Sequence, residues 1–218
     1  MNLSPYNVSE YSLTCEAQMK KSFFFRTPES RKGDIITSAL RIIDHSGIKS
    51  LTVARLAQEV GFVESALYRH FKSKRDLVSF ILDNILQEAR NHLAEVEEKA
   101  SDSLEALKQL LFLHLKFLEE YPGIFKIIYS DEIHLGDAEL QDKVNGLISE
   151  ILAFIKKVIQ KAVAERKLKA DLDVTTAAMH FLGLVYTAFS YWTIKIRRVS
   201  LRKISAKLLE QYLDGVKA

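Results

Sequence analysis

The chain has 218 residues, of which 48% are hydrophobic and 27% charged, and it contains only 8 Gly and 3 Pro. So few turn-forming residues exclude a β-sandwich and favour long helices. The single cysteine, Cys15, excludes an intramolecular disulfide and suits a reducing cytoplasm.

The net charge of +3 is unevenly distributed along the chain. Residues 1–76 contain 12 Lys and Arg against 8 Asp and Glu, whereas the remaining residues contain 19 against 20. A basic first third attached to a neutral body is expected of a DNA-binding module joined to a second domain.

The first 28 residues have no sustained hydrophobic period and are predicted to form a flexible leader. No signal peptide is predicted, because a basic start followed by an apolar run is missing. Met19, which precedes two lysines, is an equally natural start, so it stays open whether residues 1–18 belong to the natural product.

Four helices are predicted in the next seventy residues. The first begins near Arg31 and ends before Gly47, and Thr52 caps a second that ends at Gly61. A short third helix spans Glu64–Phe71, and Ser73 caps a fourth that continues to about residue 98.

Larger helices follow, and the fold class is all-α. The predicted spans are Ser103–Tyr121, Gly123–Ser130, Asp137–Arg166, Asp173–Lys195 and Ser200–Val216. Pro122 and Gly123 break the first pair, and loops are expected at 134–137 and 169–173. The expected organisation is a leader over 1–28, a DNA-binding domain over 29–75 and a helical ligand-binding and dimerisation domain over 76–218.

The stretch Val174–Ile194 contains no Asp, Glu, Lys or Arg, which is close to the length of a membrane span. It nevertheless contains four threonines, a serine and His180, and everything before it has the pattern of a soluble protein. A helix that is apolar nearly all round can also be buried in protein. We therefore favour a buried helix over a membrane helix.

The most informative segment is Leu51 to Leu77, LTVARLAQEVGFVESALYRHFKSKRDL. Two helices joined by a compact turn at Gly61 are what a helix-turn-helix requires. The segment resembles the TetR family of transcriptional regulators over about residues 31–86. The resemblance is carried by Ala57 and Gly61 at turn spacing, by residues 66–74 (ALYRHFKSK) and by Leu77.

The resemblance implies that the helix over Glu64–Phe71 is the recognition helix. It assigns phosphate contacts to Thr52, Tyr68, His70 and Lys74, and base reading to Glu64, Ser65 and Arg69, with Ala66 able to touch a thymine methyl group. Packing remains an alternative for Tyr68, a solvated charge for Arg69, and a core position for His70, whereas Leu67 and Phe71 are expected in the core.

This helix departs from the family pattern at three positions. Val63 stands where a capping Ser is frequent, Glu64 where a basic or amide residue is common, and Ala66 where a hydroxyl residue often meets phosphate. A carboxylate at the groove face repels phosphate and accepts hydrogen bonds only from cytosine or adenine amino groups. DNA binding is still expected, with an unusual operator or lower affinity.

No catalytic or metal-binding pattern is found, and neither an enzyme nor a cofactor is expected. The six histidines form no HxxxH or His/Cys cluster, and no serine elbow, glycine-rich phosphate loop or CxxC is found. A solvated loop is favoured over a metal site at Asp131, Glu132 and His134. His180 is expected to be a buried histidine more often than a ligand.

The aromatic residues of the larger domain suggest a cavity for a small apolar or amphipathic molecule. At helical spacing most of them belong to the core, and the cavity candidates are Phe112, Phe117, Tyr121, Phe125, Phe154, His180 and Tyr186. The resemblance also implies that the last two helices pair with their copies in a homodimer. Burial by a second subunit would account for the uncharged Val174–Ile194 stretch.

These observations together predict a sequence-specific transcriptional regulator. Its dimer would place two recognition helices on a pseudo-palindromic operator, and repression relieved by ligand is the mode that the resemblance implies. Two alternatives remain: a chromosome-associated DNA binder without promoter control, and a ligand-binding helical protein with weakened DNA binding. Salt-sensitive DNA binding would argue against the second.

Overall fold

The computed structural model describes residues 31–134, 136–195 and 199–217 and contains helices and loops without a β-strand in those ranges. The predicted leader, Cys15 and the alternative start at Met19 lie outside the described residues. The all-α class is therefore confirmed.

The first group of helices is small and compact. It comprises α2 (Arg31–Ser46), the 3-10 turn η1 (Ile48–Ser50), α3 (Val53–Val60) and α4 (Glu64–His70). Gly47 ends α2 with φ 78°, a backbone conformation that disfavours a side chain, as the sequence predicted for the helix end.

The second group contains the long helices. They are α5 (Lys74–Lys99), α6 (Ser103–Glu120), α7 (Gly123–Ile128), α8 (Asp131–His134), α9 (Ala138–Ala164), α10 (Val174–Ile194) and α11 (Leu201–Val216). Side chains of Ser73, Asp102, Asp137, Asp173 and Ser200 cap α5, α6, α9, α10 and α11. The predicted spans therefore agree with the structure to within a few residues.

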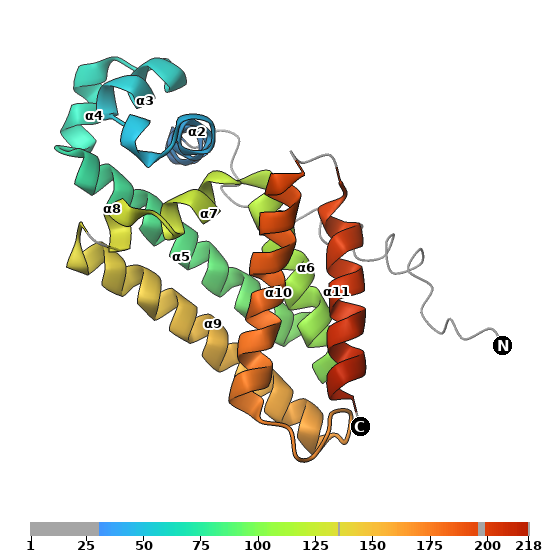
Figure 1. Cartoon of the computed structure of the whole chain (residues 1–218). Helices are drawn as coiled ribbons and strands as arrows, with labels where there is room; N and C mark the ends of the chain where they lie inside the picture. Colours follow the sequence, from blue (N-terminus) through green and yellow to red (C-terminus); the bar gives the residue numbers. More distant parts are fainter. Residues whose placement is uncertain (1–30, 135, 196–198, 218) are drawn as a thin grey trace.

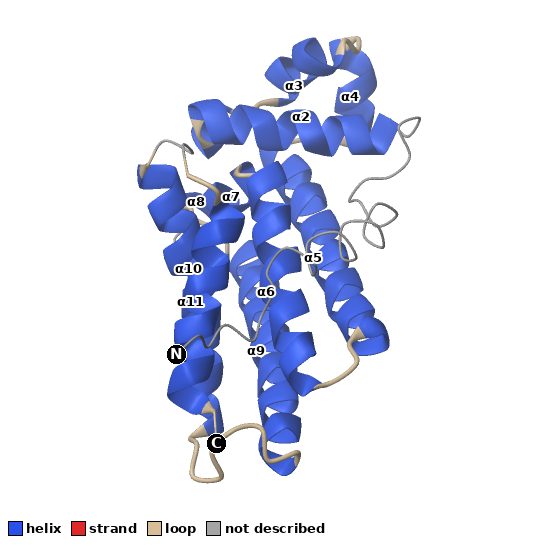
Figure 2. Cartoon of the chain, turned by 90° about the vertical axis from the view of Figure 1, so that its right-hand side faces the viewer, coloured by secondary structure: helices blue, strands red, loops and turns tan. Residues whose placement is uncertain are grey.

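Figure 1 shows α2, α3 and α4 gathered at one end of the molecule, with α5 running from that end into the bundle of long helices. In Figure 2, α2 lies across the ends of these helices and does not run alongside them. Because α5 is one continuous helix of 26 residues that runs from the first group into the second, it connects them without a break.

The structure corrects the predicted loop at Asp131, Glu132 and His134, which form the short helix α8. His134 Nε2 lies 2.8 Å from the Ile128 carbonyl oxygen, and Ile133 between them is fully buried. Burial of Ile133 and this local contact stabilise a single turn of helix. A single turn is too short to produce a helical period of apolar residues in the sequence.

The uncharged helix α10 packs against α6, α9 and α11 on one side only. Ala178, Phe181 and Ala188 are buried, whereas Met179 and Ile194 are 59% and 74% exposed. His180 is also exposed in the single chain, so the expectation of a buried histidine is wrong for one subunit. Among the described residues, no helix is long and apolar enough to cross a membrane.

Candidate nucleic-acid interface and ligand cavity

Helices α3 and α4 form a helix-turn-helix whose turn is fixed at both ends. The Thr52 hydroxyl accepts a hydrogen bond of 3.1 Å from the Arg55 amide and caps α3. Gly61 ends α3 in the left-handed conformation, at φ 75° and ψ 28°, and the next amide, of Phe62, donates to the Ala57 carbonyl at 2.9 Å. This closed turn sets the direction in which α4 leaves.

One face of α4 packs into the core and the other is exposed. Leu67 is 1% exposed, and Phe71, the first residue after α4, is 6% exposed, which confirms that both belong to the core. The six predicted DNA-contacting side chains of this helix are all exposed, and they are Glu64, Ser65, Ala66, Tyr68, Arg69 and His70. His70 therefore does not lie in the core.

The structure offers a local reason for the acidic residue at the start of α4. Val63 occupies the N-cap position and supplies no side-chain hydrogen bond. Glu64 lies in the first turn, where the partial positive charge of the helix N-terminus favours a carboxylate. Glu64 thus stabilises a helix without a polar cap, and this role does not require a contact with a base.

Lys74, a predicted phosphate contact at the start of α5, forms an ion pair with a residue of α8. Its Nζ lies 2.9 Å from Glu132 Oε2 on α8, and both side chains are about one-third exposed, at 32% and 33%. By contrast, Arg69 and Lys72 form no ion pair within the described part of the chain. The charge of Lys74 is therefore already partly neutralised by Glu132 before any phosphate approaches.

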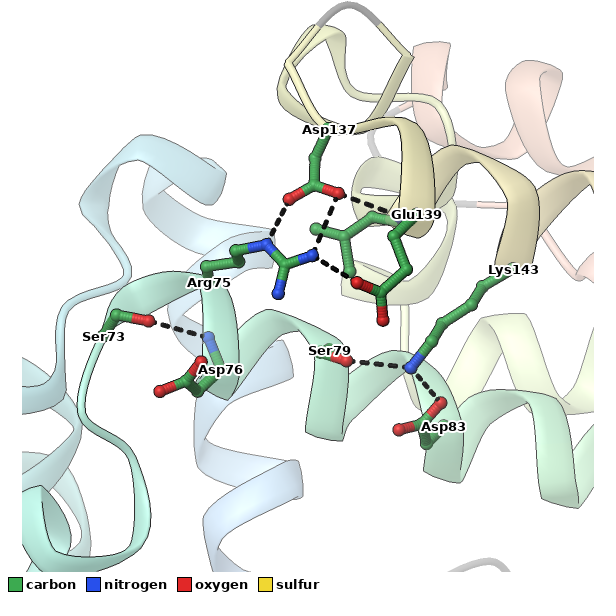
Figure 3. A network of polar contacts seen from close by, with 9 residues as sticks. Ser73, Arg75, Asp76, Ser79, Asp83, Asp137, Glu139 and Lys143 are labelled. Atoms are coloured by element: carbon green, nitrogen blue, oxygen red, sulfur yellow. Dashed lines mark hydrogen bonds and ion pairs between the residues drawn. The ribbon is translucent and has the colours of Figure 1, made fainter.

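A larger polar network joins α5 to the start of α9 (Figure 3). Arg75 pairs with Asp137 and Glu139, and Lys143 Nζ lies 2.6 Å from Asp83 Oδ1 and 2.8 Å from Ser79 Oγ. The hydrogen bond from Arg75 lowers the pKa of Asp137 below its usual value. These contacts hold the N-terminal half of α5 against α9.

A largely apolar cavity of about 330 Å³ lies among α5, α6, α7, α9 and α10. Its volume falls at the lower end of the range typical of small-molecule sites, roughly 300–1,000 Å³. Three aromatic rings at its wall are in mutual contact: Phe125 lies 4.6 Å from Tyr129 and 5.4 Å from Tyr186, between ring centroids.

The structure divides the predicted ligand-binding residues into two sets. Phe117, Phe125 and Tyr186 line the cavity. The other four lie outside its wall: Phe112 packs beneath Arg202, Tyr121 stacks on Phe117, Phe154 is half-buried on α9, and His180 is exposed.

Two histidines, one buried and one half-buried, supply the cavity wall with polar groups. His92 on α5 is 6% exposed, and its ring packs edge-on against Phe117 at 5.3 Å; His114 reaches the cavity from α6. Neither Nδ1 atom has a hydrogen-bond partner in the described structure. Burial lowers the pKa of each histidine to about 4, and the proximity of His92 lowers that of His114 further.

Sequence reasoning missed these two histidines because it searched for metal spacing. A usable signal exists in α5, where His92 continues the buried positions Ile85 and Ala89 at helical spacing. A polar ring in register with a core face indicates either a buried hydrogen bond or a ligand contact, and only tertiary packing distinguishes them.

Helix α7 lies between the cavity and the helix-turn-helix group, directly against α2 (Figure 1). Ile124, Phe125 and Ile128 line the cavity. From the same helix, Lys126 Nζ lies 3.3 Å from Asp44 Oδ1 of α2. Gly123 touches α2 so closely that an added Cβ would lie 2.2 Å from the Leu40 carbonyl oxygen.

Comparison with known proteins gives one consistent assignment. Residues 35–79 match the family model "Bacterial regulatory proteins, tetR family", and residues 81–215 match "YsiA-like protein, C-terminal region". The nucleoid occlusion factor SlmA of Shewanella pealeana is 32% identical over 160 residues, which cover 71% of this chain and 79% of that protein.

Two solved structures share the fold. The ketosteroid transcriptional regulator KstR2 of Mycobacterium tuberculosis aligns with TM-score 0.74 and 18% identity, covering 88% of this chain and 97% of that one. The regulator FadR of Bacillus subtilis in complex with stearoyl-CoA aligns with TM-score 0.69 and 20% identity, covering 84% and 97%. The chain belongs to the tetR family of bacterial regulatory proteins and is a DNA-binding transcriptional regulator.

Proposed function

We propose that the protein is a homodimeric repressor that reads a pseudo-palindromic operator and leaves it when an apolar or amphipathic molecule enters the cavity. Two copies of α4 would read the two half-sites in successive turns of the major groove. Arg69 would read a base, while Thr52, Tyr68, His70 and Lys74 would contact phosphates, and Glu64, Ser65 and Ala66 would face the groove.

The observation that carries the proposal is the position of α7. The same short helix lines the cavity with Phe125 and contacts α2 through Gly123 and Lys126. A molecule that displaces Phe125 must shift α7. Because Gly123 of α7 is packed directly against the backbone of Leu40, this shift would also move α2. Such a molecule would favour one arrangement of the two groups over the other, as a ligand-dependent switch requires.

The ion pair between Lys74 and Glu132 supports the same mechanism. Glu132 on α8 and a DNA phosphate would compete for Lys74. A shift of α7 is transmitted to α8, which follows it after two residues, and therefore changes how readily Lys74 is released. Phe117, Phe125 and Tyr186 would contact the ligand directly. The complex of FadR with stearoyl-CoA makes a long hydrocarbon chain a suitable first class of ligand.

A second candidate function is a chromosome-associated DNA binder that controls no promoter. The relatives named nucleoid occlusion factors favour it, with SlmA of Vibrio vulnificus 28% identical over 141 residues. The two functions differ in their binding sites: a repressor has a few operators near promoters, whereas a chromosome-associated protein has many dispersed sites and no derepressing ligand.

The test is a selection of bound sequences from a random duplex pool with the natural chain, Arg69→Ala, Lys74→Ala and Glu132→Gln. We expect a palindromic motif that relaxes at one position with Arg69→Ala, at a cost of about 1–3 kcal/mol. Lys74→Ala should weaken binding to all sequences alike and reduce the salt slope by about 1.

Glu132→Gln should strengthen binding by up to about fivefold, because it releases Lys74 from a partly exposed ion pair. The matched control is Glu139→Gln, which removes a partner of Arg75 and should leave DNA affinity unchanged. No enriched motif at low salt would overturn the proposed function, and genome-wide binding at many dispersed copies of the motif would favour the second candidate.

A further inference from the structure

We infer that His92 and His114 form the polar end of the ligand site and select a molecule that carries an uncharged hydroxyl group on an apolar body. The inference rests on the proposed function, because it specifies the ligand of the same cavity. It is carried by two observations: the two histidines place unpartnered ring nitrogens in the cavity wall, and that wall contains no cationic side chain in the described part of the chain.

The cavity wall is almost wholly apolar away from the histidines. The other polar groups of the cavity wall are the hydroxyl groups of Tyr129 and Tyr186. No Lys or Arg contributes to its lining in the described part of the chain. A buried anion without a cationic partner is strongly disfavoured, so the site is unsuited to a free carboxylate or phosphate.

The protonation of His92 determines which kind of ligand group it can bind. Its pKa of about 4 keeps the ring neutral near pH 7, with one nitrogen donating and the other accepting. The Glu88 carboxyl oxygen Oε1 lies 3.7 Å from Nε2 and favours the proton on that atom. Nδ1 is then left with a lone pair, and only a hydrogen-bond donor can satisfy it.

His114 extends the same argument to a second contact. Its Nδ1 has no hydrogen-bond partner either in the described structure, although the Leu110 backbone one turn earlier partly offsets the effect of burial on the pKa. A hydroxyl group can donate to one ring while it accepts from the other. Ethers and ketones only accept, and a hydrocarbon does neither.

The position of the histidines indicates how such a ligand lies. They project from α5 and α6, whereas Phe125 and Tyr186 come from α7 and α10 on other sides of the cavity. A hydroxyl group at the histidines therefore leaves the apolar body against the rings of Phe125 and Tyr186. The polar contact orients the molecule, and its apolar part then reaches the helix that contacts α2.

The experiment compares two probes of equal size on the full chain. 1-Decanol and 1-methoxynonane have the same number of heavy atoms, but only the alcohol donates a hydrogen bond. Binding is followed by the fluorescence of Trp192, the single tryptophan, whose ring lies 5.5 Å from Phe189, which stacks on Phe125 at 4.5 Å. Decanoate serves as the anionic probe of similar length.

We expect 1-decanol to bind at least about fivefold more tightly than 1-methoxynonane, the ratio that one neutral hydrogen bond supplies. In His92→Leu the ratio should fall to within about twofold, whereas in the control His45→Leu, on the exposed end of α2, it should persist. His114→Leu is the second variant and should reduce the ratio in the same direction.

Equal binding of the alcohol and the ether, absence of binding by both, or tighter binding of decanoate would each overturn the inference. The comparison of probes needs no variant, so it stands even if His92→Leu fails to fold. Titration of the protein with a duplex from the selection, carried out in parallel, distinguishes failure of this inference from failure of the proposed function. Retained DNA binding without discrimination among the probes defeats only the inference, whereas loss of specific DNA binding defeats the proposed function itself.

Discussion

At the scale of single residues, burial has different consequences for the histidines of this chain. His70 was a possible core residue by sequence, yet it is exposed on α4, whereas His92 is 6% exposed beside the cavity. Both lie on amphipathic helices, but His70 is on the exposed face of α4 and His92 is on the buried face of α5. Titration of His92 and His114 should therefore occur at a lower pH than the ordinary value for histidine.

We predict that acidification destabilises the protein through His92 and His114. Their pKa values of about 4 lie below the ordinary 6.5, so the unfolded chain binds more protons between these values and stability falls as the pH falls. Each should contribute a loss of about 2 kcal/mol between pH 7 and pH 5. Urea unfolding followed by circular dichroism at both pH values measures it.

His92→Leu should lose less stability than the natural chain over the same interval, because leucine takes up no proton. His45→Leu, at an exposed position of α2, is the matched control for the histidine-to-leucine substitution itself. A natural chain equally stable at pH 5 and pH 7 would contradict the low pKa values of the two histidines.

At the scale of elements, the contact of α7 with α2 depends on the absence of a side chain at Gly123. Gly123 begins α7 directly after Pro122, and its own hydrogen faces the backbone of Leu40 in α2. The sequence explains Gly123 as a turn residue. The structure adds that the close approach of two helices, one from each group, requires it.

We predict that Gly123→Ala lowers the free energy of unfolding by about 2 kcal/mol, because the added methyl group meets a backbone oxygen that cannot turn away. Gly146→Ala is the control: this exposed glycine inside α9 has open space around it. Alanine there should raise the free energy of unfolding by about 0.5–1 kcal/mol. Equal effects of the two substitutions in denaturant melts would refute the close contact.

At the scale of the whole molecule, α10 has more apolar surface than one chain can cover. Met179, Tyr186 and Ile194 are all at least half exposed, at 59%, 51% and 74%. A helix with no charged residue and such an exposed face is typical of an obligate interface. This supports the proposed homodimer through α10 and α11, in which His180 would become buried.

We predict that Thr187→Arg, which places a charge in the middle of this face, converts the dimer into a monomer. The residue is exposed in one chain, so folding of the single subunit should persist, while a buried unpaired charge opposes association. Sedimentation velocity measures the change. Gln160→Arg, on an exposed position of α9, should leave the mass unchanged, and a monomeric natural chain would rule out the homodimer.

The sequence alone determined the class of fold, the helix boundaries and the helix-turn-helix, because these depend on local information. Ser, Thr and Asp caps, Gly47, Gly61 and the periodicity of apolar residues act within a few residues of the chain. The same local information explains why α8 was missed, since four residues stabilised by one buried isoleucine carry no period of their own.

Only the tertiary structure decided which residues form the cavity and which groups couple it to α2. Phe117 lines the cavity and Phe112, on the same helix, does not, because the packing of α11 determines which face of α6 remains open. His92 lies near enough to His114 to lower its pKa, and Lys74 meets Glu132, across separations that no sequence pattern encodes. Such contacts arise from the packing of whole helices, which local propensity and periodicity leave undetermined.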